Sequence, residues 1–297
     1  MTKQLSLFEL SKTDASETKA QKGVNVASVP LRSPFRYPGG KTWLVPTARL
    51  WLQACGGEGK VLFDVFAGGG IVGLTAIFEN LVDHLILVAL DDDVAAVWQV
   101  ILSGDAGWLV DRILSFEMTV ENARGAIAAA DSSLRARAFA TIVKNRVNRG
   151  GILADGASFV RHGENGKGIR SRWYPTTLRR RILAIDHIRE RITFVHGDAF
   201  AVCRHHAHDP HALFFIDPPY VKAGRRLYRH SEIDHPALFA QASALKGDFL
   251  MTYDDHPEIR QLAATHDLQV GEISMKTTHH TQKRELLISR RLDWLPW

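Results

Sequence analysis

The sequence predicts an α/β fold, in which a mainly parallel sheet is covered by helices on both faces. Six short apolar runs predict the strands, and they lie at residues 61–66, 85–90, 192–196, 212–217, 248–253 and 285–289. Uninterrupted apolar runs of this length are typical of strands that are buried on both sides. Segments with a helical pattern separate most of these runs, which favours parallel strands joined by crossover helices.

The spacing of the predicted strands divides the chain into three parts. Residues 1–30 are polar and lack apolar periodicity, which predicts a flexible tail. Residues 31–103 and 192–297 carry the strands and are expected to form the sheet domain. Because the interval between the second and third strands is far longer than an ordinary crossover, residues 104–191 are predicted to form an inserted, mainly helical subdomain with a Gly-rich loop.

The composition is that of an ordinary globular protein. Of the 297 residues, 45% are hydrophobic and 23% are charged, which excludes a disordered chain and a collagen-like fibre. No segment has the roughly 18 apolar residues of a membrane-spanning helix, and the first residues lack a signal-peptide pattern, so we expect a cytoplasmic protein with no membrane partner. Cys55 and Cys203 are too few for a disulfide framework. The histidine-rich segment at residues 205–211 has no matching ligand group, so no metal is expected.

The basic residues are concentrated in one region of the chain. Residues 134–191 contain 14 Lys or Arg residues and 4 acidic residues, a net charge of +10, whereas the whole chain carries only +5. A concentrated basic segment predicts a polyanionic partner, above all nucleic acid. A solvated helical face is the alternative that the charge pattern alone leaves open.

A glycine-rich turn follows the first predicted strand. Gly68 and Gly70 belong to a formal GxGxxG pattern, and Phe66 directly precedes it. Glycines at a strand-to-helix turn let the backbone approach a ligand closely. Asp91 lies 21 residues after Gly70, about where a ribose-binding acid is expected. The turn alone leaves a nicotinamide site and an S-adenosylmethionine site open.

A second motif stands at the end of the apolar run that begins at residue 212. Asp217, Pro218, Pro219 and Tyr220 follow one another there, at the sheet edge where open α/β folds bind ligands. The prolines remove two N–H donors and leave rigid carbonyls beside a carboxylate and an aromatic ring. An exocyclic amino group on a flat base is the complementary shape.

The motifs, taken together and in order, resemble those of the Dam-type (D12 class) DNA adenine N6-methyltransferases. The matching segments are FRYPGGK (35–41), DVFAGGG (64–70), NRVNRGG (145–151), HGDAF (196–200), DPPY (217–220) and RELLI (284–288). The resemblance implies a Rossmann-like S-adenosylmethionine-dependent methyltransferase sheet with an inserted target-recognition subdomain. It implies a site-specific enzyme that methylates N6 of a flipped adenine in double-stranded DNA.

The resemblance also implies which residues bind S-adenosylmethionine. They are Tyr37, Lys41, Phe66, Gly68, Gly70, Asp198 and Asp217. The family's ribose-binding acid falls at a position where this chain has Ala89. Asp91, two residues further on and on the same side of an extended chain, is the expected substitute.

The predicted mechanism follows from the chemistry of the target. The N6 amino group is a poor nucleophile because its lone pair is delocalised into the ring. Hydrogen bonds to the Asp217 carboxylate and the Pro218 carbonyl are expected to favour a pyramidal nitrogen and to stabilise the developing positive charge, while Tyr220 stacks on the base. Since that nitrogen is inaccessible inside a duplex, the nucleotide has to be flipped out.

The basic insert is expected to bind the DNA. Phosphate binding is the default role of its polar and basic residues, and which of them read bases stays open. The candidates are Lys144, Asn145, Arg146, Asn148, Arg149, Arg161, Lys167, Arg170, Arg172, Arg179 and Arg180.

A short apolar cluster interrupts the polar tail. Gln4, Leu5, Ser6, Leu7 and Phe8 form the pentapeptide QLSLF, which resembles the peptide by which bacterial replication and repair proteins bind the DNA polymerase sliding clamp. Packing of Leu7 and Phe8 on the chain's own domain is the alternative. The expected partners are therefore double-stranded DNA and the sliding clamp, and a restriction nuclease stays open as a third.

Other functions remain as alternatives to adenine methylation. Ala89 and the pentapeptide together favour a catalytically silent DNA-binding homologue recruited to the clamp. N4 of cytosine or an adenine in RNA presents a similar amino group to the same chemistry. A nicotinamide oxidoreductase is the weakest alternative, because it explains neither the Asp-Pro-Pro-Tyr motif nor the basic insert.

Overall fold

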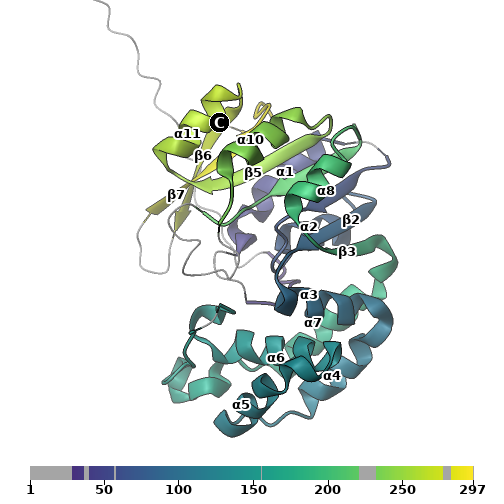
Figure 1. The fold of residues 1–297 in the computed structure, drawn as a ribbon, viewed down its shortest axis with the longest axis vertical. Helices are drawn as coiled ribbons and strands as arrows, with labels where there is room; N and C mark the ends of the chain where they lie inside the picture. The colour runs from purple at the N-terminus through teal and green to yellow at the C-terminus, as the bar shows by residue number, and fades with distance from the viewer. Residues whose placement is uncertain are drawn as a thin grey trace, which may run out of the picture.

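A seven-stranded sheet forms the centre of the protein (Figure 1). The computed structural model describes residues 29–36, 40–56, 58–154, 156–220, 232–276 and 282–296. The strand order is β3-β2-β1-β4-β5-β7-β6. The first five strands in that order are parallel, and β7 is antiparallel to both β5 and β6. The bounds are β1 Val61–Asp64, β2 His84–Ala89, β3 Ile192–His196, β4 Ala212–Ile216, β5 Asp248–Asp254, β6 Gln269–Lys276 and β7 Gln282–Ser289.

The predicted α/β fold is confirmed, with one strand added. The six predicted strands correspond to β1 to β5 and β7, whereas β6 was not predicted. β6 lies at the edge of the sheet and pairs only with β7. Because an edge strand with an exposed side has no need of an uninterrupted apolar run, its sequence QVGEISMK mixes polar and apolar residues.

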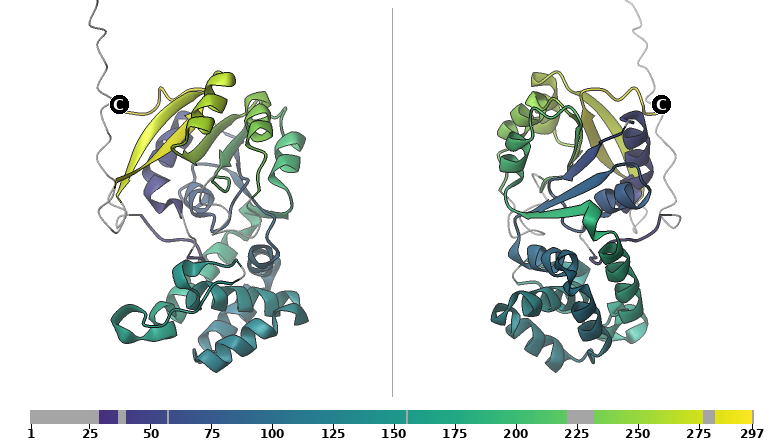
Figure 2. Two further views of the ribbon diagram at one scale, coloured as in Figure 1. Left: turned by 60° about the vertical axis from the view of Figure 1, so that its left-hand side comes forward. Right: turned by 90° about the vertical axis from the view of Figure 1, so that its right-hand side faces the viewer.

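Helices cover both faces of the sheet, as the two side views show (Figure 2). Alternating side chains of each strand serve the two faces: in β4, Phe214 packs in one core cluster, and Leu213 and Phe215 pack in the other. The cluster of Phe214 includes residues of α8 (Ala199–His205), α10 (His235–Ala244) and α11 (Pro257–Thr265). The other cluster includes residues of α1 (Val45–Ala54), α2 (Ile71–Phe78) and α3 (Asp92–Val100). The short helix η2 (Lys41–Leu44) precedes α1.

The chain between β2 and β3 forms a second, helical lobe below the sheet in Figure 1. Ser133 caps its longest helix, because the Ser133 hydroxyl accepts a hydrogen bond of 3.1 Å from the backbone N–H of Ala136. The elements are η3 (Ile101–Asp105), α4 (Ala106–Leu114), α5 (Val120–Ala128), η4 (Ala130–Ser132), α6 (Leu134–Val147), η5 (Arg149–Gly151), η6 (Glu164–Gly166), η7 (Gly168–Arg172), α7 (Pro175–His187) and η8 (Arg189–Arg191).

One apolar core joins the helical lobe to the sheet domain. α3 follows β2 and packs against α6 of the lobe. Trp98 of α3, Ile142 of α6 and Ile182 of α7 are completely buried in the same cluster that contains Leu87 of β2. The two lobes therefore share their packing and do not meet through a solvated linker.

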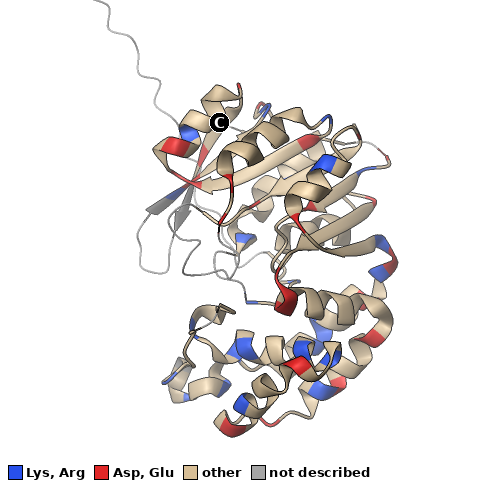
Figure 3. Ribbon diagram, viewed as in Figure 1, with Lys and Arg blue, Asp and Glu red and all other residues tan. Residues whose placement is uncertain are grey.

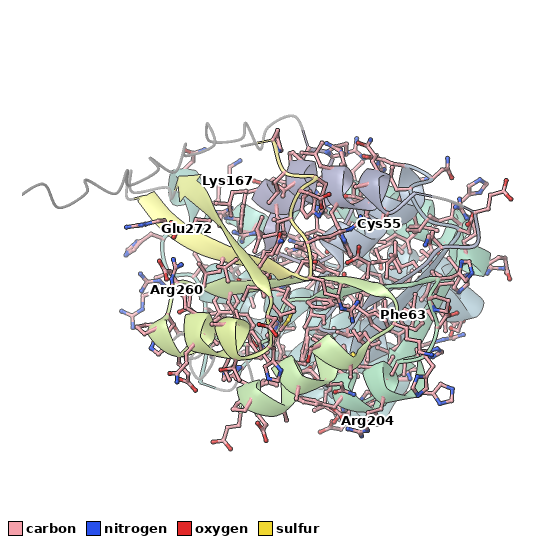
Figure 4. All side chains as sticks on the ribbon, turned by 90° about the horizontal axis from the view of Figure 1, so that it is seen from above. Cys55, Phe63, Lys167, Arg204, Arg260 and Glu272 are labelled. Carbon is pink, nitrogen blue, oxygen red and sulfur yellow. The ribbon has the colours of Figure 1, made fainter. Side chains whose placement is uncertain are left out.

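Basic positions are more frequent on the helical lobe than on the sheet domain (Figure 3). Lys and Arg positions are frequent on the helical lobe, where acidic positions are interspersed among them (Figure 3). On the sheet domain an ion pair of 2.6 Å between Arg260 of α11 and Glu272 of β6 ties the edge strand to its neighbouring helix (Figure 4). None of the helices in the described ranges is both long and apolar enough to span a bilayer.

Candidate active site

The glycine-rich turn is a tight connection between β1 and α2. Gly68 and Gly70 adopt φ angles of +45° and +61°, in the left-handed region that favours glycine. The indole N–H of Trp98 donates a hydrogen bond of 3.0 Å to the carbonyl oxygen of Gly68, which fixes the turn from the core side. A Cβ on Gly70 would lie 3.2 Å from a methyl group of Leu87, so the turn packs tightly on the core at this glycine.

A cavity of about 420 Å³ lies at this turn. Its walls come from both lobes: the glycine turn and the ends of β1 and β4 on one side, and residues 150, 151, 153, 154 and 181 of the helical lobe on the other. Such a volume is within the usual range for small-molecule sites. Four carboxylates line it, those of Asp64, Asp91, Asp198 and Asp217, so the sheet side of the cavity favours a cationic or N–H-rich ligand.

Two of these carboxylates are fixed at helix N-termini. One oxygen of Asp91 accepts hydrogen bonds from the backbone N–H groups of Asp93 (2.9 Å) and Val94 (3.1 Å), which caps α3. Asp198 caps α8 in the same way, with bonds of 3.2 Å from Phe200 and Ala201. Because β2 and β3 are neighbours in the sheet, both acids lie at the same edge. Their orientations are thus set by the helices that they start.

Asp217 is anchored through one of its two oxygens. Its Oδ1 accepts from the Thr252 hydroxyl at 2.7 Å, lies 3.2 Å from the Tyr220 hydroxyl oxygen, and pairs with the Lys41 ammonium at 3.0 Å. No described residue donates a hydrogen bond to Oδ2. The carboxylate is therefore held in one orientation and keeps an acceptor oxygen for a ligand, with 21% of the side chain exposed at the cavity wall.

Glu285 completes the network behind Asp217. The Tyr220 hydroxyl donates to Glu285 Oε2 at 2.7 Å, and the Lys41 ammonium lies 3.3 Å from the same oxygen. Lys41 also contacts the Tyr220 hydroxyl directly. Glu285 is 3% exposed and stands on β7, opposite Asp254 of β5. A buried carboxylate, ammonium and phenol thus hold the end of β4 against β5 and β7.

The network fixes the protonation of Lys41 and Tyr220. Burial on its own lowers the pKa of Lys41, but the charges of Asp217 and Glu285 outweigh it and raise that pKa above its ordinary value. Burial, followed by the charges of the same two carboxylates, raises the pKa of Tyr220 well above its ordinary value. Lys41 is therefore an ammonium and Tyr220 a neutral phenol at neutral pH, and neither can act as a base.

Asp64 is the most deeply buried acid of the cavity wall. It ends β1 and is 2% exposed. Burial, and then the charge of Asp217, raises the pKa of Asp64 to about 7, against a smaller lowering by the backbone N–H of Gly73. A Cβ on Gly73 would lie 3.1 Å from Asp64 Oδ2, so α2 approaches the carboxylate closely at a glycine. Asp64 therefore exchanges its proton near neutral pH.

The structure brings most of the predicted cofactor and catalytic residues to this cavity. Pro218 is buried behind the wall, and Tyr220 has its hydroxyl directed into the network described above. Tyr37 and the pentapeptide at residues 4–8 lie outside the described residues. The predicted residues that line the cavity are Lys41, Phe66, Gly68, Gly70, Asp91, Asp198, Asp217 and Pro219.

Three predicted DNA contacts are corrected by the structure, because their side chains are buried. Asn145, Arg146 and Asn148 are 0%, 4% and 5% exposed. The Asn145 amide accepts from the backbone N–H of Arg36 (2.8 Å) and donates to the carbonyl oxygens of Arg36 (2.7 Å) and Gly151 (2.9 Å). These side chains hold the backbone of the cavity wall and do not reach the surface on which DNA would lie.

The other predicted DNA contacts differ in accessibility. Lys144 pairs with Asp93 at 3.1 Å, and Arg172 is half-buried. The remaining six are exposed, and they are Arg149, Arg161, Lys167, Arg170, Arg179 and Arg180. These six residues lie in the loop after α6 and in α7.

Three site residues were not predicted from the sequence. They are Asp64, Thr252 and Glu285. Asp64 is the only charged residue in VLFDVF, and Glu285 begins the apolar run ELLIS. A single charge in a strand that is otherwise apolar was the available signal, since such a group is buried only with a partner or a function. Thr252 carried no such signal.

The comparisons with known proteins give only distant similarities. No family model and no curated protein matches the sequence. Among solved structures, the rRNA methyltransferase AviRa from Streptomyces viridochromogenes is 13% identical with a TM-score of 0.39, over 90% of this chain and 93% of that one. The tRNA methyltransferase TrmK from B. subtilis is 9% identical with a TM-score of 0.35, over 84% of this chain and 66% of that one. The chemistry of the site therefore has to be inferred from its own residues.

Proposed function

We propose that the protein is an S-adenosylmethionine-dependent methyltransferase that acts on N6 of a flipped adenine in double-stranded DNA. One observation carries the proposal: Asp217 and Pro219 of the Asp-Pro-Pro-Tyr segment line the same cavity as the glycine-rich turn. The turn suits a nucleoside-like cofactor, and the anchored Asp217 carboxylate suits an amino group. The sequence resemblance to the Dam-type family supports the choice of adenine and of DNA.

The residues of the cavity fit S-adenosylmethionine. Gly68 and Gly70 line the cavity in left-handed backbone conformations that favour glycine, so the turn can approach a nucleoside closely. Asp91 and Asp198, at the ends of neighbouring strands, would bind the ribose and adenine ends of the cofactor. The acidic lining complements its ammonium and sulfonium charges. When bound, the cofactor supplies an electrophilic methyl group.

Asp217 would orient and activate the acceptor nitrogen. Its Oδ1 is fixed by Thr252, Tyr220 and Lys41, which leaves Oδ2 to accept one N–H of the substrate amino group. The negative charge stabilises the positive charge that develops on the nitrogen during attack. Because Lys41 remains an ammonium, it cannot accept the amino proton, and it serves to hold the carboxylate in place.

The helical lobe would supply the nucleic-acid surface. Its exposed arginines and Lys167 lie on the lobe that forms one wall of the cavity. Phosphate contacts there would hold a duplex across the cavity mouth, and the base would enter by flipping. We also propose that the pentapeptide at residues 4–8 binds a bacterial sliding clamp, which its sequence alone supports.

Transfer of labelled methyl groups to unmethylated DNA tests the proposal. We expect N6-methyladenine at a fixed short sequence, loss of transfer in Asp217→Ala, and normal transfer in Glu58→Ala, a change at an exposed turn residue. Label in RNA or on N4 of cytosine would refute the assigned substrate. DNA binding without any transfer would refute the enzyme and favour a silent homologue, for which Ala89→Asp is the first change to make.

A further inference from the structure

Three arginines, Arg36, Arg146 and Arg181, gather at the wall of the cavity that the helical lobe provides. Arg146 of α6 is buried, and Arg181 of α7 is half-buried. Arg146 donates a hydrogen bond to the backbone carbonyl oxygen of Pro34, and Arg181 donates one to that of Ser33. Burial, followed by the charges of Arg181 and Arg36, lowers the pKa of Arg146 to about 9. The three positive charges are thus close enough to repel one another.

Neither Arg146 nor Arg181 has an acidic partner among the described residues. The Nε atoms of both are also buried without a hydrogen-bond partner there. Arg146 is only 4% exposed, so its guanidinium has lost most of its hydration without gaining a carboxylate. Buried charges are normally paired, and a pair of unpaired arginines in one place favours an anionic ligand.

The cluster borders the cavity. Arg36 and Arg181 line it directly, next to Gly150 and Gly151 of the loop after α6. Asn145 fixes the backbone of Arg36 by accepting from its N–H and donating to its carbonyl oxygen. The cavity is therefore basic where the helical lobe and the Arg36 segment meet, and acidic at the carboxyl edge of the sheet.

From this arrangement we infer that Arg36 and Arg181, supported by Arg146, bind the phosphate attached to the nucleotide whose base is placed at Asp217. This inference rests on the proposed function, and it adds a phosphate subsite inside the cavity to the exposed DNA surface. A nucleotide is the ligand that joins an N–H-rich base to an anion through a sugar. Arginine is suited to the anion because its planar fork binds phosphate oxygens in pairs.

Binding of two small ligands tests the inference without any need to know the recognition sequence. Titration calorimetry compares deoxyadenosine 5′-monophosphate with deoxyadenosine, each in the presence of S-adenosylhomocysteine. We expect the wild type to bind the monophosphate about tenfold or more tightly than the nucleoside, as charge-assisted hydrogen bonds predict. If the wild type binds the monophosphate and the nucleoside with nearly equal affinity, so that the ratio of the two affinities is close to one, the inference is overturned, whatever any variant does.

Variants then locate the site. Arg181→Met should bring the ratio close to one, Arg181→Lys should keep part of it, and Arg204→Met, at an exposed position of α8 on the other lobe (Figure 4), should leave it unchanged. If Arg181→Met fails to fold, Arg181→Lys decides, because an unchanged ratio there counts against the planar fork. A variant that binds S-adenosylhomocysteine more weakly but keeps the ratio of monophosphate to nucleoside affinity would assign the arginines to the cofactor carboxylate and overturn the inference.

The outcome is separable from that of the proposed function. A protein that transfers no methyl group but shows the phosphate-dependent ratio would retain the subsite and lose the enzymatic assignment. An active enzyme with a ratio close to one would retain the assignment and lose the subsite.

Discussion

Asp64→Asn should change how the stability of the protein depends on pH. Asp64 is 2% exposed, and burial and the Asp217 charge raise its pKa from 3.8 to about 7. The unfolded chain therefore releases this proton at a lower pH than the folded protein does. The stability that the protonated Asp64 carboxyl contributes is fully present below about pH 4, falls as the pH rises, and is lost above about pH 7.

The size of the effect follows from the shift in pKa. About three pH units at 1.36 kcal/mol each amount to about 4 kcal/mol between the two limits. Between pH 5 and pH 7 the expected loss is about 2 to 3 kcal/mol. Asparagine keeps the shape of the side chain and an oxygen for the backbone N–H of Gly73, but it does not ionise.

Urea unfolding followed by tryptophan fluorescence at pH 5, 6, 7 and 8 measures the effect. The free energy of unfolding of Asp64→Asn minus that of the wild type should increase by up to 1.4 kcal/mol per pH unit up to pH 7 and then level off. Asp111→Asn, at an exposed position of α4, should follow the wild-type curve at every pH. Parallel curves for the wild type and Asp64→Asn would refute the reasoning, since they would exclude a pKa near 7 for Asp64 in the folded protein.

Three other predictions concern the cavity wall, the buried network and the tail. Gly150 and Gly151 both have positive φ, but only at Gly151 would an added Cβ overlap a backbone carbonyl oxygen. In urea unfolding, Gly151→Ala should therefore destabilise the protein by at least about 1 kcal/mol more than Gly150→Ala. Equal losses of stability in the two variants would contradict this. Glu285→Gln removes one of the two carboxylates that face Lys41, and it should cost about 1 to 3 kcal/mol of stability and lower kcat more than it raises the KM for DNA; an unchanged kcat would disconnect the network from catalysis. Deletion of residues 1–10 should abolish binding to a bacterial sliding clamp in surface plasmon resonance and leave methyl transfer to short oligonucleotides intact; undiminished clamp binding would reject the pentapeptide as the binding site.

Most of the strands that were predicted are buried on both faces, which forces an apolar sequence. Phe214 and Phe215 of β4 point into different core clusters, so neither face tolerates a polar residue there. The two edge strands differ: β3 (ITFVH) is mainly apolar and was predicted, whereas polar residues interrupt β6 (QVGEISMK), which escaped prediction. The physical signal in a sequence is thus strongest where the environment is most uniform.

The two local motifs of the site were predictable, and the contacts between them were not. Tight turns and Asp-Pro-Pro-Tyr are recognisable because each depends on neighbouring residues. Lys41, Asp217 and Glu285 meet only because the fold brings together η2, the end of β4 and β7, although β5 lies between the two strands in the sheet. Such a meeting depends on the register of the strands, which no short segment encodes.

Residue type was misleading in the basic insert. Asn145 and Arg146 stand in a segment rich in arginine, which favoured contacts with DNA. Their burial depends on how α6 packs against the chain before residue 37, and the hydrogen bonds of Asn145 to Arg36 span 109 positions of sequence. Polar residues that serve long-range backbone contacts look the same in sequence as residues that serve a partner.

The shared core between α3 and α6 limits how target specificity could be exchanged between related chains. A graft at residues 104–191 would cut between Trp98, on the sheet side, and Ile142 and Ile182, on the lobe side, all of which are completely buried together. A transplanted lobe would then meet a foreign α3, and the mismatch would also reach the glycine turn, because Trp98 holds the carbonyl oxygen of Gly68. Transfer of specificity would require α3 to travel with the lobe, so that recognition and cofactor pocket are inherited as one unit.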